Sequence, residues 1–246
     1  TRGRSETISL SYPVIRSREE NLTVGGLFSF RESDTLQLGL LSTRDKLRVL
    51  RLSATYDKAD AIGGGGVSLF SATLSQGFDI ASAQVESRLL ADEDFTHLGL
   101  TARRIQQLEK LGNEWSLDLR FQAQYANETL ASPEQFGLGG ENSVRGYEPA
   151  EWTGDSAFTG SAELRYQMPT EWDGDIQLYT FYDYGKVWRE NEANLPLIEK
   201  TVSVDSAGIG TRVNFPEDIA LNLELTKPFD EHFDGDSADW ELYGRF

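Results

Sequence analysis

Residues 158–168 read FTGSAELRYQM, in which apolar or small residues alternate with polar ones. Side chains point alternately to the two faces of a β-strand, so this stretch has one apolar face and one face that carries Glu163 and Arg165. In a soluble sheet the polar face meets water, whereas in an outer-membrane barrel the apolar face meets lipid and the polar face lines the lumen. This stretch is compatible with both architectures, and the rest of the chain must decide between them.

The same period of two recurs on both sides of this stretch, and we expect about eleven strands from it. The other clear examples are residues 50–56, 70–75, 97–103, 113–126, 176–184, 206–213, 219–226 and 240–246. Pro13 is expected to end the first alternating run, because proline cannot donate to a strand ladder. Residues 31–45 are polar at both ends, and we interpret them as a longer loop.

Strand length and charge favour a membrane barrel over a soluble sandwich. The strands of a sandwich average about 5–6 residues, whereas the strands expected here approach the roughly 10 residues that cross a membrane when tilted. Their polar faces carry charges of both signs, and Trp115, Trp188 and Trp240 lie near strand ends. The sequence therefore predicts an all-β fold, an antiparallel transmembrane β-barrel.

Composition excludes several other classes of protein. The 246 residues hold no run near the roughly 18 consecutive apolar residues of a membrane helix. A net charge of −17 argues against a nucleic-acid partner, because phosphate binding needs clustered Lys and Arg. The chain has no cysteine, and its two histidines, His97 and His232, are far apart in sequence, so we expect no metal site.

A glycine-rich segment between the strands carries a specific resemblance. The sequences FGLGG at 136–140, SVRGY at 143–147, GD at 154–155 and ELR at 163–165 resemble the signature of the polypeptide-transporting outer-membrane barrels. Within that superfamily they are most similar to the two-partner secretion transporters of the haemolysin secretion/activation type.

Further matches lie outside the glycine-rich segment. Phe181, Asp183 and Gly185 resemble the Phe-x-Asp-x-Gly strand motif of that family, and residues 12–17, YPVIRS, resemble one of its periplasmic turns. The chain ends on Phe246, like the terminal aromatic residue of outer-membrane barrels. The resemblance extends over essentially the whole chain.

The resemblance implies a barrel of about sixteen strands that follows periplasmic substrate-binding (POTRA) domains. Six expected strands precede the glycine-rich segment and five follow it, so residues 1–246 would be the C-terminal part of the barrel domain, with the POTRA domains and the first strands absent. An odd number of antiparallel strands cannot close on itself, and lipid does not tolerate open sheet edges. With no signal peptide visible at Thr1, we expect that an export signal has been removed or that the sequence is a piece of a longer protein.

The resemblance also assigns roles to single residues. The loop that contains them would fold into the lumen, where Arg145 would meet Asp183 on the barrel wall. The functional motif of the loop, VRGY, is Val144, Arg145, Gly146 and Tyr147, and its strand partners are Phe181, Asp183 and Gly185. A guanidinium binds a carboxylate through two parallel hydrogen bonds, which lysine cannot reproduce. At the end of the chain, Trp240, Leu242 and Phe246 would act as the insertion signal.

The implied function is transport of an unfolded exoprotein from the periplasm to the surface of a Gram-negative bacterium, without a cofactor. The implied partners are that exoprotein, outer-membrane lipid with lipopolysaccharide, and the barrel-assembly machinery during biogenesis. An insertase of the same superfamily is the alternative, and a passive porin is a further one. An outer-membrane enzyme is the alternative of another class, and it would need His97 or His232 beside an acidic residue at the outer rim.

Overall fold

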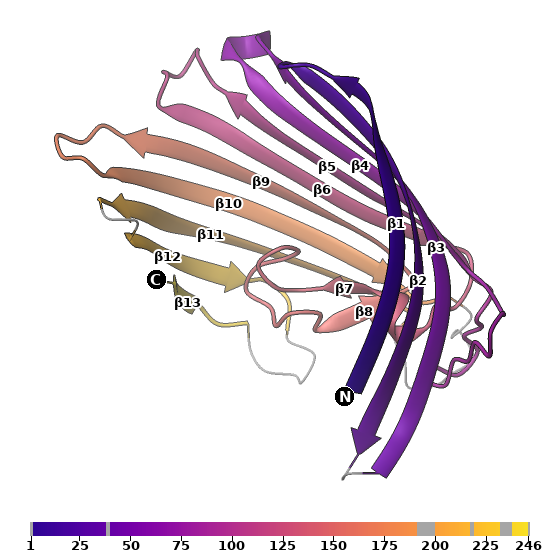
Figure 1. Ribbon diagram of the computed structural model, residues 1–246. Helices are drawn as coiled ribbons and strands as arrows, with labels where there is room; N and C mark the ends of the chain where they lie inside the picture. The colour runs from indigo at the N-terminus through magenta and orange to yellow at the C-terminus, as the bar shows by residue number, and fades with distance from the viewer. Residues whose placement is uncertain (1, 38–39, 191–199, 217–218, 232–237, 246) are drawn as a thin grey trace.

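The computed structural model describes residues 2–37, 40–190, 200–216, 219–231 and 238–245. Its main element is one sheet of eleven strands, in which strands that are consecutive along the sheet pair in antiparallel fashion (Figure 1). Six of these strands precede the glycine-rich segment and five follow it, as the sequence predicts. Among the described residues, no helix is long and apolar enough to cross a lipid bilayer.

The strands of the large sheet follow chain order. They are β1 (Arg2–Arg16), β2 (Glu20–Gln37), β3 (Leu40–Asp60), β4 (Gly66–Gly77), β5 (Thr96–Gln107), β6 (Trp115–Ala126), β9 (Ser156–Met168), β10 (Asp175–Trp188), β11 (Thr201–Phe215), β12 (Ile219–Pro228) and β13 (Glu241–Arg245). A second, two-stranded sheet joins β7 (Phe136–Leu138) to β8 (Trp152–Gly154), and 3-10 turns lie at η1 (Ile62–Gly64) and η2 (Ser132–Glu134).

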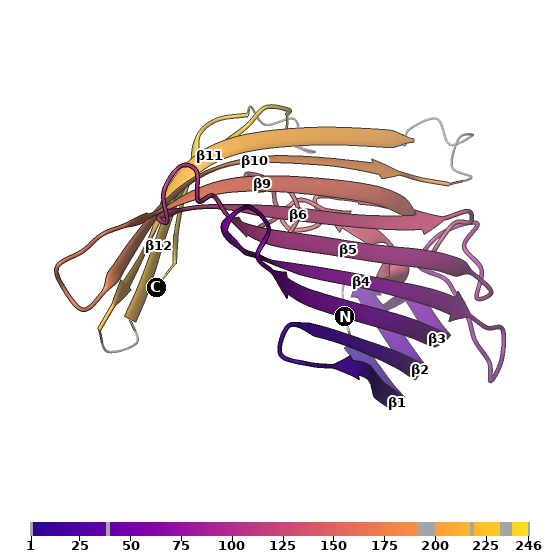
Figure 2. The ribbon, with the colours of Figure 1, turned by 90° about the horizontal axis from the view of Figure 1, so that it is seen from above.

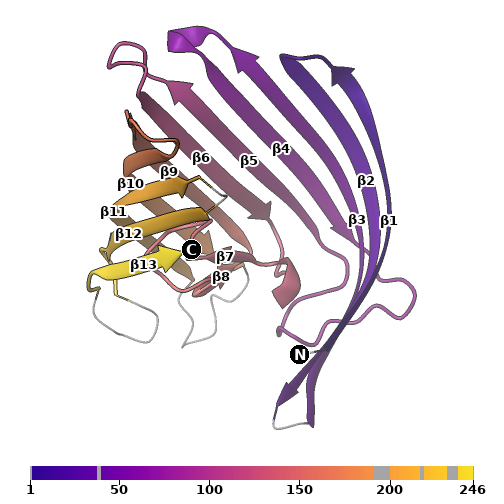
Figure 3. The ribbon, with the colours of Figure 1, turned by 60° about the vertical axis from the view of Figure 1, so that its left-hand side comes forward.

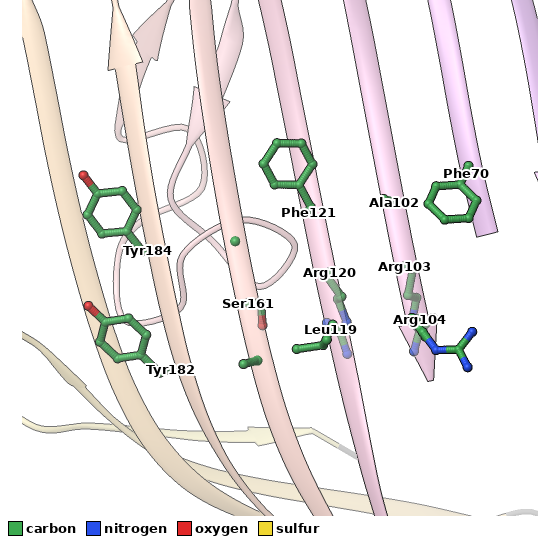
Figure 4. A pocket seen from close by; sticks show the side chains of 12 residues that line it. Phe70, Ala102, Arg103, Arg104, Leu119, Arg120, Phe121, Ser161, Tyr182 and Tyr184 are labelled. Atoms are coloured by element: carbon green, nitrogen blue, oxygen red, sulfur yellow. The ribbon is translucent and has the colours of Figure 1, made fainter. Parts of the chain in front are cut away.

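The large sheet curls, so it has a concave face and a convex face (Figure 2). Alternation distributes the side chains between them as predicted. Tyr182, Ile209 and Leu242 are 48%, 58% and 76% exposed, whereas Glu163 and Asp183 are 0% and 1% exposed. In Figure 4 the rings of Phe70, Phe121, Tyr182 and Tyr184 project from the convex face, which meets lipid in an outer-membrane barrel. The concave face is hereafter the lumen face.

The prediction of a long loop at 31–45 is wrong. β2 and β3 continue through this segment and form a long hairpin that extends past the rest of the sheet (Figure 3). Asp34 lies opposite Arg44, and the Arg44 guanidinium donates to the two Asp34 carboxylate oxygens at 2.7 and 2.9 Å. Oppositely charged cross-strand pairs of this kind stabilise antiparallel strands. The described residues of this segment lack the apolar alternation on which the prediction rested.

The first strand also runs further than its sequence predicts. β1 passes through Pro13 and ends at Arg16, with a register shift between Pro13 and Ile15. The turn follows at residues 17–19, where the Ser17 amide donates to the Glu20 carbonyl at 3.0 Å. Proline is tolerated at such irregularities and on edge strands, and β1 pairs with β2 alone within the described residues.

A prediction follows from the two faces of the sheet. Because the chain has no cysteine, a single introduced cysteine reports its own surroundings. We expect Ile209→Cys, on the convex face, to be quenched by a lipid-borne quencher when it carries a fluorophore, and to react slowly with a charged thiol reagent. Thr101→Cys, on the lumen face of β5, should react rapidly and escape the quencher. The opposite pattern in assembled protein would show that the faces are reversed.

Candidate functional site

The segment between β6 and β9, residues 127–155, folds back against the lumen face (Figures 1 and 3). It carries β7 and β8, and its tip contains the VRGY motif. Its apolar residues form a buried cluster with three residues of the wall. The loop contributes Leu138, Val144, Tyr147 and Trp152, and the wall contributes Ala157, Val187 and Val204. Val144 and Leu138 are completely buried, so the loop is packed against the wall by the hydrophobic effect as well as by charge.

Arg145 is the centre of the polar contacts and is 5% exposed. Its Nε and Nη2 atoms donate to the two carboxylate oxygens of Asp183 at 2.7 and 2.9 Å, which is the two-bond geometry of an arginine fork. Its Nη1 atom donates to Glu163 at 2.9 Å and to Glu224 at 3.3 Å. The Arg145 amide also donates to Asp183, at 3.2 Å. One loop residue is thereby joined to β9, β10 and β12.

The surroundings of Arg145 favour the protonated form of its guanidinium. Burial by itself lowers the pKa of the guanidinium, but the hydrogen bonds and charge of Asp183, with the charge of Glu224, outweigh burial, and the pKa of Arg145 is raised. A buried charge is tolerated only when it is paired and hydrogen-bonded. The dependence is mutual, because Asp183 and Glu163 are themselves buried.

An aromatic ring completes the surroundings of Arg145. The guanidinium carbon lies 3.3 Å from the centroid of the Phe181 ring, within the range of a cation–π contact. The ring can lie there because the neighbouring strand β11 has glycine at position 208. A Cβ on Gly208 would be 2.5 Å from Phe181 Cζ and 2.6 Å from the Leu225 carbonyl oxygen. Phe181 and Gly208 therefore form one unit, opposite each other in the β10–β11 register.

The same arrangement is repeated one step along the two strands. Tyr179 lies opposite Gly210, and a Cβ on Gly210 would be 2.3 Å from the tyrosine ring. The Arg212 guanidinium lies over that ring, 3.9 Å from its centroid. The Tyr179 hydroxyl donates to Glu224 at 2.9 Å. The Tyr179 and Phe181 rings thus form a flat shelf on which two arginines rest.

The other motif residues, Gly146, Gly185 and Tyr147, allow the loop to approach the strands closely and bind it to them. Gly146 has a φ of +84°, and a Cβ there would be 2.9 Å from Thr226, so both its conformation and its close approach to β12 require glycine. A Cβ on Gly185 would be 2.3 Å from Leu138, which packs in that space. The Tyr147 hydroxyl donates to the Asp205 carbonyl at 2.9 Å, and burial raises its pKa to about 12.

A second ionic contact fixes the base of the loop. Asp155 is completely buried and accepts hydrogen bonds from Arg88 at 2.5 and 3.2 Å. It also accepts from the amides of Leu130 and Glu190, both at 2.8 Å. Asp155 thus joins both ends of the loop to the β4–β5 connection and to the segment after β10.

The structure brings the loop motif and the strand motif together, and the motif at the chain end lies elsewhere. Trp240 and Leu242 are 62% and 76% exposed, and Phe246 lies outside the described residues. The sequence predicts Glu163 on the polar face of its strand, and the alternating stretch 219–226 includes Glu224, but it does not identify either residue as a partner of Arg145. Their alternation was visible, but contact with Arg145 depends on strand register, which the alternation does not give.

Among the residues that the structure describes, no group of three or more His, Cys, Asp and Glu residues could hold a metal ion. His97 Nε2 lies 3.2 Å from Glu134, which also accepts two hydrogen bonds from Arg51 at 2.6 Å. His232 lies outside the described residues. Glu134 is thus a partner of lumen-face residues at the start of the loop.

Comparison with known proteins gives one family. Residues 1–213 match the family described as haemolysin secretion/activation protein ShlB/FhaC/HecB. The heme/hemopexin transporter protein HuxB of Haemophilus influenzae strain 86-028NP is 23% identical over 230 residues, which cover 92% of this chain and 40% of HuxB. The chain thus spans less than half the length of the curated relatives that it matches.

Solved structures share the fold. CdiB from Escherichia coli matches with a TM-score of 0.78 and 17% identity, over 98% of this chain and 44% of that protein. CdiB from Acinetobacter baumannii matches with a TM-score of 0.74 and 18% identity, over 98% of this chain and 41% of that protein. BamA from Haemophilus ducreyi, in a form lacking POTRA domains 1–3, matches with a TM-score of 0.65 and 14% identity, over 98% and 54%.

The glycine opposite Phe181 generates a prediction. Gly208→Ala must push the Phe181 ring or the Leu225 backbone aside, and overpacking of this kind costs about 1–3 kcal/mol. We expect a lower free energy of unfolding in urea and faster proteolysis of the loop in the assembled protein. The matched control is Gly160→Ala on β9, because a Cβ there would have no atom within 4 Å. Equal behaviour of the two variants would show that the Phe181 shelf does not hold the loop.

Proposed function

Because the chain belongs to the haemolysin secretion/activation protein family ShlB/FhaC/HecB, we propose that the whole protein passes an unfolded exoprotein from the periplasm to the cell surface. This is the transport step of two-partner secretion. The chain is part of an outer-membrane β-barrel protein of Gram-negative bacteria. Its relative HuxB is named a heme/hemopexin transporter protein. We propose that the whole protein likewise moves its substrate without an enzymatic step.

The observation that carries the proposal is the position of the loop. A loop packed on the lumen face takes up room through which a polypeptide would pass, so its attachment governs the passage. Arg145 joins the loop to three strands through Asp183, Glu163 and Glu224. Residues Val144 and Tyr147 add apolar contact with the wall. We therefore assign the VRGY motif and Phe181, Asp183 and Gly185 to the control of transport.

The partners follow from the same proposal. The exoprotein is the cargo, outer-membrane lipid with lipopolysaccharide surrounds the convex face, and the barrel-assembly machinery inserts the protein, with Trp240, Leu242 and Phe246 as the signal. We propose that residues 1–246 form the C-terminal part of the barrel domain, and that further strands and POTRA domains complete it. The share of HuxB that the chain covers, 40%, supports this division. The likeness to BamA concerns the fold alone and favours no second function.

The ion pairs of Arg145 give the test of this proposal. Arg145→Ala in the whole protein leaves three buried carboxylates without their common partner, and breaking a buried pair costs about 3–5 kcal/mol. We expect strongly reduced secretion of the exoprotein and altered conductance in planar bilayers. Asp183→Ala should do less damage, because Arg145 keeps its bonds to Glu163 and Glu224.

A double variant shows whether the two residues act together. Arg145→Ala with Asp183→Ala should be little worse than Arg145→Ala alone, since residues in direct contact do not contribute additively. Arg18→Ala, in the exposed turn between β1 and β2, is the control for loss of one positive charge. Normal secretion by assembled Arg145→Ala protein, or strictly additive losses, would contradict a gating role for this contact.

A further inference from the structure

A second group of charged residues lies on the lumen face beside the loop site. Three arginines share the carboxylate of Asp118, which is completely buried. Arg103 donates to its two oxygens at 3.0 and 2.7 Å, and Arg120 donates at 3.1 and 3.0 Å. Arg165 also pairs with Asp118, and it donates to Glu163 at 2.6 Å. Arg103, Arg120 and Asp118 are hereafter the arginine patch.

The arginine patch has more positive charge than its own fold requires. Arg103 and Arg120 lie directly opposite each other on β5 and β6, and like charges in such positions destabilise a sheet. One carboxylate, Asp118, neutralises only one of the two charges. Glu163 joins the patch to the loop site, and the joined cluster still has one positive charge in excess. Its five arginines are Arg103, Arg120, Arg145, Arg165 and Arg212, and its four carboxylates are Asp118, Glu163, Asp183 and Glu224. A positive excess is retained here in a chain whose net charge is −17.

The patch can reach a ligand. The side chains of Arg103 and Arg120 are 44% and 30% exposed. Each uses Nε and Nη2 for Asp118, and within the described residues these bonds leave Nη1 of each fork available. In Figure 4 the guanidinium groups lie behind the strands, on the side opposite the exposed rings of Phe121 and Tyr182. They therefore point into the lumen and away from lipid.

The position of the patch relates it to the loop. Gln122 of β6 donates to the carbonyl of Asn142 in the loop at 2.9 Å. Arg120 is two residues from Gln122 in the direction of the turn at 108–114, which lies at the same end of the sheet as the turn at 17–19. That end is periplasmic if residues 12–17 lead into a periplasmic turn, as the family resemblance implies. A chain entering from there meets the patch just before the loop.

We propose that the arginine patch is a binding site for carboxylate side chains of the polypeptide in transit, a role that rests on the proposed transport function. Arginine forks bind carboxylates through charge-assisted hydrogen bonds, which are stronger than neutral ones. Acidic segments of an unfolded cargo would pair with Arg103 and Arg120 on their way to the loop. Because each contact is exposed to water on one side, it is weak enough to release the cargo.

The test measures block of the channel by charged peptides. The whole protein is placed in planar bilayers, and a short oligoglutamate or a short oligolysine is added on the periplasmic side. We expect oligoglutamate to block conductance at lower concentration than oligolysine. Arg103→Gln with Arg120→Gln should raise the half-blocking concentration of oligoglutamate by about two- to fivefold for each arginine removed, which is the change for about 0.4–1 kcal/mol. Heat-modifiable mobility shows which variants are assembled.

Three further variants make the outcome specific. Arg18→Gln removes the same charge at an exposed turn and should leave the block unchanged. Arg103→Lys with Arg120→Lys keeps the charge without the fork and should restore part of the block. If the double Gln variant does not assemble, Arg103→Gln alone is used, because Asp118 keeps Arg120 and Arg165. An unchanged block in an assembled Gln variant overturns the proposal.

The two proposals fail in different ways. If the unaltered protein does not release an exoprotein from cells that produce both, the transport function is wrong whatever the peptides do. If it does release one, but the arginine patch does not discriminate between the two peptides, only the binding site is wrong. Reduced secretion of an acidic exoprotein by the Gln variant, with normal assembly, supports both.

Discussion

The structure depends on one constraint, which is that a guanidinium removed from water must find its hydrogen bonds and its counter-charges nearby. Arg145 meets this constraint only when the loop lies against β9, β10 and β12 at once, because its three partners come from three strands. The penalty for a misplaced loop is therefore large, and it falls on both sides of the contact. Apolar packing around Val144 holds the loop against the lumen face of the sheet. The ion pairs of Arg145 fix the position of the loop relative to β9, β10 and β12.

Glycine makes this geometry possible on a wall of strands. Ordinary side chains on β11 would push the rings of Tyr179 and Phe181 away from the sheet, and Gly208 and Gly210 let them lie flat. The flat rings then support Arg212 and Arg145 at cation–π distance. Gly208 and Gly210 therefore determine how close the guanidinium groups of Arg145 and Arg212 lie to the sheet.

The sequence could predict the strands and the residue types of the site, but not all of its contacts. Period-two alternation is enough to place Glu163 and Asp183 on the polar faces of their strands, and in an outer-membrane barrel the polar face lines the lumen. It fails at residues 31–45, where the strands lack apolar alternation and are joined by the cross-strand ion pair Asp34–Arg44. It is equally silent about register, so the meeting of Arg145 with Glu163 and Glu224 could not be read from spacing. The Arg145–Asp183 pair was anticipated through family resemblance.

Hydrogen–deuterium exchange of the assembled protein measures whether Arg145 fastens the loop to the lumen face. The loop amides around Arg145, whose own amide donates to Asp183, should exchange slowly, at rates near those of β9 and β10. In Arg145→Ala protein the loop should exchange faster by orders of magnitude while the two strands stay protected. Fast exchange of the loop in the unaltered protein, or equal protection of the loop in both proteins, would contradict the account.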